Sequence, residues 1–202
     1  MTTWLMIGSS PSVLQTLPQF ADFDGMTITC NSGICLWPVP DVYFAIDQFA
    51  SVMWHDEAAN AQRMGTKLVS VLRGPKAAKQ RKIEHYDLFL DLAHKTNPSR
   101  TDYGEFRYSG PLCVEHACHN GAEVIHLIGM DGYRHGNDYW DADKALGRRN
   151  LPNMKSTHTE AHIQPRMQQL ADVWHDVQFI QHGDPCYVVN ADNWEVRAAC
   201  LQ

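Results

Sequence analysis

Short runs of apolar residues recur along the chain, and each run ends at polar or turn-forming residues. They cover residues 4–7, 26–30, 42–46, 68–72 and 124–128, with a weaker run at 177–180. A short apolar run bounded by turn signals is typical of a strand that is buried on both faces. Helical patterns separate several of these runs, and such alternation predicts βα units. We therefore expect a Rossmann-like α/β fold, with a mostly parallel sheet and helices on both faces.

Two helices stand out between these runs. Ser109 and Pro111 are typical of a helix start, and Gly121 of the residue after a helix end. The apolar face of this first helix consists of Leu112, Cys113, His116 and Ala117. Pro165 suits the first turn of a second helix, in which apolar residues recur at helical spacing. These residues are Met167, Leu170, Ala171 and Trp174.

The length of 202 residues predicts a single domain over 1–202. Residues 76–95 begin with a basic stretch and are interpreted as a solvated helix or loop, while 96–104 and 147–157 are interpreted as loops. Within the domain we expect 76–105 and 140–157 to be loop or lid insertions.

Charge and composition exclude several functions. Lys and Arg number 17 against 23 Asp and Glu, a net charge of −6, which argues against a general nucleic-acid binder. No apolar run reaches the ~18 residues of a membrane span, and the N-terminus lacks the basic lead of a signal peptide. The six cysteines form no Cys-x-x-Cys pair, which favours reduced, mostly buried thiols and a cytoplasmic location.

Small or polar residues follow four of the apolar runs directly. They are the Gly8-Ser9-Ser10 turn, Asn31, Asp47 and Asp131. In open α/β sheets ligands bind beyond the carboxyl ends of the strands, so these residues predict a composite ligand site. The alternative is that Gly, Asn and Asp end strands because they favour turns. The turn at 8–12 matches neither the dinucleotide-binding glycine pattern nor the P-loop, although its N–H groups and serines suit an anion.

Three residues after the fifth apolar run could take part in catalysis. Tyr133 and Tyr139 could stabilise a negative leaving group, and His158 in a loop could act as a general base. The alternative for the tyrosines is packing within a loop. No metal site is expected: the residues around His158 match a zinc-protease motif only superficially. Helical spacing scatters Cys113, His116, Cys118 and His119 over different faces, and Asp141-Ala142-Asp143 alone is weak evidence.

Several segments, taken in order, resemble the bacterial sialyltransferases of glycosyltransferase family 42, which use CMP-sialic acid, or a short relative of them. The segments are Ile7-Gly8-Ser9-Ser10-Pro11-Ser12, Thr29-Cys30-Asn31, Phe106-Arg107-Tyr108-Ser109-Gly110 and the stretch from Gly121 to Tyr139. That last stretch is similar to the family pattern Gly-x-x-x-Ile-x-Leu-x-Gly-x-Asp-x-Tyr-x-x-Gly-x-x-Tyr. His158 stands five residues before Ile163, as the family's catalytic histidine stands before its last helix.

The resemblance implies a role for each matched residue. His158 would deprotonate an acceptor hydroxyl, Tyr133 and Tyr139 would hydrogen-bond the departing phosphate in place of a metal, and Arg107 would lie by the charged part of the donor. Residues expected to hold the nucleotide are Gly8, Ser9, Ser10, Pro11, Ser12, Asn31, Asp47, Ser109, Gly110, Asp131 and Gly132. Asp47 stands where the family has a strand-end asparagine, so its role is open.

The predicted function is a metal-independent glycosyltransferase without a cofactor. Its donor would be a nucleotide sugar, for which the resemblance implies a CMP-linked acidic sugar, and its partner would be a glycan or other hydroxyl acceptor. Ser9-Ser10 replaces the family's Asn-Gly and the segment before His158 is short, so donor and acceptor stay open. One alternative is a pterin pyrophosphokinase-like enzyme that holds Mg²⁺ with Asp47, Asp131, Asp141 and Asp143. Another is a non-catalytic nucleotide-binding module. A homo-oligomer that completes the site is a further hypothesis.

Overall fold

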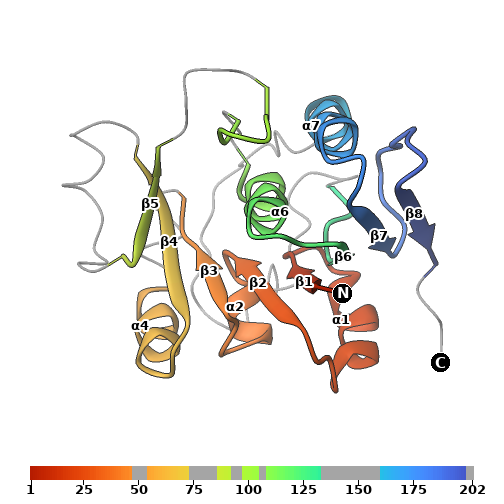
Figure 1. The fold of residues 1–202 in the computed structure, drawn as a ribbon. Helices are drawn as coiled ribbons and strands as arrows, with labels where there is room; N and C mark the ends of the chain where they lie inside the picture. The colour runs from red at the N-terminus through yellow and green to blue at the C-terminus, as the bar shows by residue number, and fades with distance from the viewer. Residues whose placement is uncertain (47–53, 73–85, 92–96, 105–107, 133–159, 199–202) are drawn as a thin grey trace.

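The described strands form one parallel sheet (Figure 1). The computed structural model describes residues 1–46, 54–72, 86–91, 97–104, 108–132 and 160–198. Within these ranges the sheet has eight strands in the order β5-β4-β3-β2-β1-β6-β7-β8. The strands are β1 Thr3–Ile7, β2 Met26–Cys30, β3 Val42–Phe44, β4 Lys67–Leu72, β5 Leu88–Asp91, β6 Val124–Ile128, β7 Gln178–His182 and β8 Trp194–Arg197. The Rossmann-like α/β fold expected from the sequence is confirmed.

Helices cover both faces of this sheet (Figure 1). On one face lie α6 (Ser109–His119) and α7 (Glu160–Val173). On the other lie α1 (Val13–Thr16), the 3-10 turn η1 (Leu17–Phe20), α2 (Gly33–Leu36) and α4 (His55–Arg63). Among the helices of the described ranges, none combines the length and the apolar character that crossing a membrane requires.

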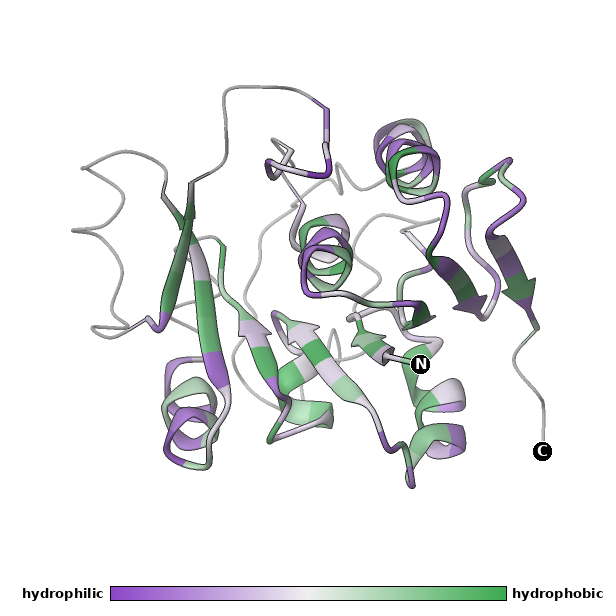
Figure 2. Ribbon diagram, in the orientation of Figure 1, coloured by the Kyte–Doolittle hydropathy of each residue, from purple (hydrophilic) through white to green (hydrophobic). Residues whose placement is uncertain are grey.

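The strand sequences explain this arrangement. Side chains alternate between the faces of a strand, so a strand covered on both sides reads as a continuous apolar run. In β1, Trp4 and Met6 join the core under α6 and α7, while Leu5 and Ile7 pack with Val13 and Phe20 on the other face. Figure 2 shows the central strands as mainly hydrophobic and more hydrophilic residues in β7 and β8.

Strand order reverses between β1 and β6, two neighbouring strands in the interior of the sheet. β1 pairs with β2 on one side and with β6 on the other, with Leu5 beside both Thr27 and His126. The chain then runs outward through β3, β4 and β5 on one side and through β7 and β8 on the other. A crevice opens at such a switch point beyond the carboxyl ends of the strands, which is where open α/β sheets bind ligands.

The structure corrects two local predictions. Leu88–Asp91 form β5, so the interpretation of 76–95 as helix or loop is wrong for these residues. The last helix begins before Pro165, which lies inside α7 rather than in its first turn. The reason is Ile163, whose buried side chain extends the apolar stripe of the helix back past the proline. The helix start expected at Ser109 and Pro111 is confirmed, because α6 begins at Ser109, with Tyr108 in the capping position.

Candidate functional site

A pocket opens at the switch point of the sheet. It is a hollow on the surface with about 430 Å³ of empty space when the solvent at its open side is included, and it is formed by the ends of β1, β2 and β6 together with α6 and α7. Its lining residues are Gly8, Ser9, Ser10, Cys30, Asn31, Ser109, Gly110, Pro111, Gly129, Met130, Gly132 and Ile163. None of these side chains carries a charge, so the described wall is built from hydroxyl, amide and backbone groups beside a few apolar ones.

The floor of the pocket is a close contact between the ends of β1 and β6. The Gly8 N–H donates to the Ile128 carbonyl at 2.8 Å, and the Ser10 N–H donates to the Gly129 carbonyl at 2.9 Å. A Cβ atom on Gly8 would lie 2.2 Å from the Gly129 oxygen, closer than any side chain can come. Gly129 itself has a φ of +63°, in the left-handed region that glycine adopts without strain. The two glycines therefore let the two strand ends meet.

Asn31 enters the pocket from the end of β2 in an unusual backbone conformation. Its φ is +52°, a left-handed conformation that asparagine tolerates better than most residues. The Tyr43 hydroxyl donates to the Asn31 carbonyl at 3.3 Å and supports this turn. The side-chain Oδ1 of Asn31 is buried and has no hydrogen-bond partner among the described residues, and the same holds for Ser9 Oγ. A buried polar atom without a partner costs free energy, so both atoms favour a polar ligand in this pocket.

The start of α6 forms another wall. Ser109, Gly110 and Pro111 line the pocket, and among the described residues no side chain caps the N-terminus of this helix. The first N–H groups of a helix have no partner within it, and the aligned peptide dipoles make this end partly positive. A Cβ atom on Gly110 would lie 2.5 Å from the end of the Met130 side chain, so the glycine leaves room at the pocket wall. This wall suits an anionic group such as a phosphate.

Most of the predicted nucleotide-binding residues meet at this pocket. Those that line it are Gly8, Ser9, Ser10, Asn31, Ser109, Gly110 and Gly132. Pro11, Ser12 and Asp131 do not line it. Ser12 and Asp131 lie together near Gly183, where an added Cβ atom would approach Asp131 Oδ1 to 2.9 Å and Ser12 Oγ to 3.4 Å. Asp47, Arg107, Tyr133, Tyr139 and His158 lie outside the described residues.

The sequence analysis missed five lining residues. They are Cys30, Pro111, Gly129, Met130 and Ile163. Three of them, Cys30, Pro111 and Met130, are next to predicted site residues in the sequence, and this adjacency is a signal that could have found them. Met130 and Ile163 give the pocket an apolar side that suits the face of a ring. Ile163 comes from α7, and only the tertiary structure brings it to the pocket.

The cysteines and histidines of α6 have structural partners. Cys30 and Cys113 are free thiols, and burial together with contact to Cys30 raises the pKa of the Cys113 thiol well above its usual value. His116 Nδ1 lies 2.8 Å from the Tyr103 hydroxyl, and His119 packs on Tyr103 and Trp174. Among the residues that the structure describes, no three His, Cys, Asp or Glu side chains gather as a metal ion would require.

Comparison with known proteins finds likeness in structure but not in sequence. No protein-family model and no curated protein matches the chain. The sialyltransferase CstII from Campylobacter jejuni, solved with the substrate analogue CMP-3FNeuAc, superposes with a TM-score of 0.57 at 12% identity; the match covers 90% of this chain and 81% of CstII. The monofunctional alpha-2,3-sialyltransferase Cst-I from the same organism gives a TM-score of 0.57 at 11% identity, over 90% of this chain and 75% of Cst-I.

A larger protein shares the fold as well. MAf glycosyltransferase from Magnetospirillum magneticum AMB-1 superposes with a TM-score of 0.61 at 12% identity. The match covers all of this chain and 34% of the MAf protein, so the chain corresponds in length to about a third of it. The resemblance to the family 42 sialyltransferases that the sequence motifs suggest is thus accompanied by a likeness of the fold. The chain has the fold of the CstII and Cst-I sialyltransferases and of part of a MAf glycosyltransferase.

Proposed function

We propose that this protein is a glycosyltransferase that moves a sugar from a CMP-linked donor, of the sialic acid type, to a hydroxyl group of a glycan or another acceptor. The observation that carries the proposal is the uncharged pocket at the switch point, with Ser9 Oγ and Asn31 Oδ1 buried in it without a partner. The fold supports it, because CstII has been solved with CMP-3FNeuAc, with CMP, and with a trisaccharide acceptor together with CMP.

The pocket suits a pyrimidine nucleotide by its chemistry. The amide of Asn31 and the hydroxyl of Ser9 can pair with the polar edge of a base or with ribose hydroxyls. Met130 and Ile163 offer apolar contact to a ring, and the free N–H groups at the start of α6 offer hydrogen bonds to a phosphate. These groups bind and orient the donor without a metal or a cofactor.

The chemical step would use residues outside the described ranges. His158 would take the proton from the acceptor hydroxyl as its oxygen attacks the anomeric carbon of the donor sugar. The bond from that carbon to the phosphate oxygen breaks, and CMP leaves with the negative charge. Tyr133 and Tyr139 would donate hydrogen bonds to the departing phosphate, and Arg107 would lie by the charged part of the donor. One displacement inverts the configuration at the anomeric carbon.

A thermal-shift panel with CMP, UMP, GDP and ATP tests the donor. A nucleotide at a hundred times its Kd stabilises the folded chain by about 2.7 kcal/mol, which raises Tm by roughly 5–10 °C in a protein of this size. We expect this shift with CMP and little shift with the others. Ser9→Ala and Asn31→Ala should each reduce it, whereas Asn60→Ala, on the exposed surface of α4, should not. No shift with any nucleotide would overturn the proposal in favour of a different ligand.

A transfer assay with CMP-sialic acid tests the mechanism. His158→Ala should abolish transfer, while His175→Ala, a histidine on the exposed surface after α7, should leave it unchanged. EDTA should have no effect, since no step in the proposed mechanism needs a divalent ion. Loss of activity in EDTA would favour the Mg²⁺-dependent alternative, and full activity of His158→Ala would refute its role as the base.

A further inference from the structure

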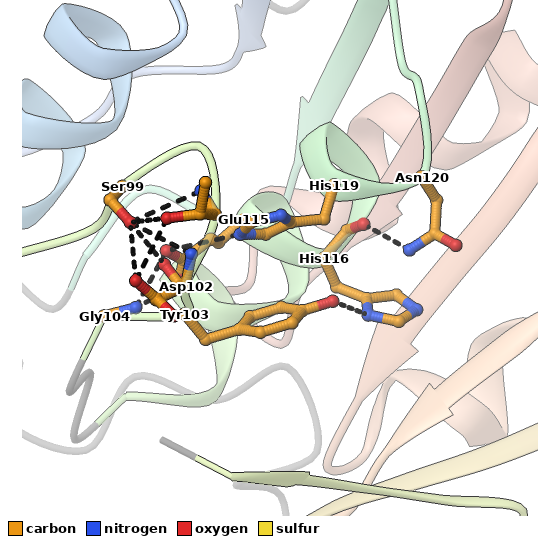
Figure 3. A network of polar contacts seen from close by, with 9 residues as sticks. Ser99, Asp102, Tyr103, Gly104, Glu115, His116, His119 and Asn120 are labelled. Atoms are coloured by element: carbon orange, nitrogen blue, oxygen red, sulfur yellow. Dashed lines mark hydrogen bonds and ion pairs between the residues drawn. The ribbon is translucent and has the colours of Figure 1, made fainter. Parts of the chain in front are cut away.

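Glu115 on α6 is an ionisable residue that is fully buried. Its side chain has no exposed surface, although it stands in a helix whose first residues line the pocket. Both carboxyl oxygens accept the Gly104 N–H, at 2.9 and 3.1 Å. Figure 3 shows the segment 97–104 folded against this part of α6, with Glu115 pointing toward Gly104. Buried carboxyl groups are rare and costly, so this one calls for an explanation.

The segment held by Glu115 is itself a compact turn. The Ser99 N–H donates to the Asp102 carbonyl at 3.2 Å, and the Asp102 N–H donates to Ser99 Oγ at 2.9 Å. Gly104 closes the turn, because a Cβ atom there would lie 2.8 Å from the Pro98 nitrogen. The position of Gly104 is therefore fixed by the turn on one side and by Glu115 on the other.

Other contacts tie this turn to α7 and to the residues between α7 and β7. Arg100 pairs with the Asp176 carboxylate, with one hydrogen bond of 2.9 Å, and its guanidinium lies over the Trp174 ring at 5.1 Å. Gln169 donates to Asn97 at 3.1 Å. Tyr103 and His116 share the hydrogen bond of 2.8 Å. The turn thus bridges α6 and α7, the two helices that contribute to the pocket wall.

The turn is close in sequence to the α6 side of the pocket. Tyr108 follows Gly104 by four residues and is the capping residue of α6, and the next residues, Ser109 and Gly110, line the pocket. Since each residue spans at most ~3.6 Å, the hold on Gly104 limits where Tyr108 and the first N–H groups of α6 can lie. We propose that Glu115 is a positioning residue for nucleotide binding, which fixes Gly104 and through it the backbone at the α6 side of the pocket. This inference rests on the proposed function.

Because Glu115 can ionise, its contact with Gly104 should depend on pH. Burial raises the pKa of the Glu115 carboxyl to about 8, against the opposing effect of the Gly104 hydrogen bond. The groups that face it are His119, with Nε2 4.0 Å from Oε1, the Tyr103 phenol and the Cys118 thiol. Burial lowers the pKa of His119 and raises those of Tyr103 and Cys118, so all three are uncharged near pH 7. No described cation faces the carboxylate. Ionisation of the carboxyl therefore favours a state in which Gly104 moves away and water reaches the charged group.

Two substitutions separate the parts of this proposal. Glu115→Gln keeps a carbonyl oxygen for the Gly104 N–H but cannot ionise, whereas Glu115→Ala removes the acceptor. Loss of one such hydrogen bond should raise the Kd for CMP by about tenfold in Glu115→Ala. In the wild type the Kd should rise about threefold or more between pH 6.5 and 8.5, since docking weakens as the carboxyl ionises. Glu115→Gln should keep the low Kd across this range. Glu195→Gln, an exposed glutamate paired with Arg197 on β8, should behave as the wild type.

The measurement is isothermal titration of CMP at pH 6.5, 7.5 and 8.5, with hydrogen exchange of residues 97–104 followed without nucleotide. At equal pH, exchange of this segment should be faster in Glu115→Ala than in Glu115→Gln. If Glu115→Ala does not fold, Glu115→Gln against the wild type decides alone. A wild-type Kd that does not change with pH, or one that changes equally in Glu115→Gln, overturns the proposal. If the wild type binds no CMP, the proposed function fails, and equal exchange of 97–104 in the wild type and both variants would overturn the positioning role separately.

Discussion

Glu115→Gln should make the protein more stable than the wild type at alkaline pH but not at acidic pH. The substitution replaces a buried carboxyl group by a neutral group of the same shape, which resembles its protonated form. The carboxyl has a pKa of about 8 in the folded chain against an ordinary value of 4.5. The folded state therefore binds the proton more tightly than the unfolded state. The stability that this proton contributes is complete below pH 4.5 and is lost as pH rises toward 8.

The window from pH 6.5 to 8 isolates this effect. Below it, His116 and His182 interfere, because burial lowers the pKa of each to about 4. Above it, the Cys113 and Cys118 thiols begin to ionise in the unfolded chain. Inside it, Glu115 costs the wild type about 1.4 kcal/mol for each pH unit, or about 2 kcal/mol in all. That corresponds to a fall in Tm of about 4–8 °C.

Urea unfolding at pH 6.5, 7.25 and 8, followed by far-UV circular dichroism, measures the effect. The free energy of unfolding should fall over this range in the wild type and in Glu195→Gln, and stay level in Glu115→Gln. Equal slopes in the wild type and Glu115→Gln would refute the reasoning, because the buried carboxyl would then be ionised already at pH 6.5 or remain neutral at pH 8.

Three further predictions follow from the contacts around the pocket and beneath the sheet. Gly8→Ala should destabilise the protein by about 3 kcal/mol or prevent folding, because its Cβ atom would lie 2.2 Å from the Gly129 oxygen. Gly121→Ala is the control: Gly121 has a φ of +80° but open space around it, so the substitution should cost only about 1 kcal/mol. Urea unfolding measures the free energy of unfolding of both variants. Tyr187→Phe should cost about 1–2 kcal/mol in the same assay, because the buried hydroxyl bonds the Met130 carbonyl at 2.8 Å and Gln181 Oε1 at 3.0 Å; an unchanged stability would contradict this. Stability should also fall as pH drops from 6.5 toward 4, because the buried His116 and His182 are neutral in the folded chain and must take up protons; in His182→Gln this fall, measured by thermal melts, should be shallower.

Patterns of apolar residues predicted the centre of the fold but not its edges. The central strands are buried on both faces, so each reads as an unbroken apolar run, as in Trp4 to Ile7. At the sheet edges, β8 is Trp-Glu-Val-Arg with three exposed residues, and β5 is a short run after a basic stretch. A strand with one covered side and few residues does not stand out from loops in a single sequence. The two strands missed by the sequence analysis are accordingly the two edges of the sheet.

Turn residues after the strands predicted much of the pocket for a similar reason. Gly8, Asn31 and Gly132 are residue types that favour turns, and each follows a strand. The topology of a parallel sheet brings the carboxyl ends of its strands to one edge, and with them these residues. Ile163 and Glu115 could not be found in this way. Ile163 reaches the pocket through the packing of α7, and Glu115 looks like a solvated helix residue until the structure places Gly104 against it. Both depend on contacts between segments distant in sequence.

The described pocket wall carries no charged side chain, and this explains why the position of the backbone matters for binding. Binding of an anion by lysine or arginine acts over several ångströms and tolerates small shifts, whereas N–H groups at a helix start bind only at hydrogen-bond distance and in the right direction. The wall formed by Ser109 and Gly110 is of the second kind. Affinity there depends on the placement of the backbone to within a fraction of an ångström. A buried, neutral Glu115 that holds Gly104 would supply such placement without adding a negative charge to the helix at which we propose that the phosphate binds. An ionised carboxylate at the same position would weaken the placement of Gly104 and would repel the phosphate.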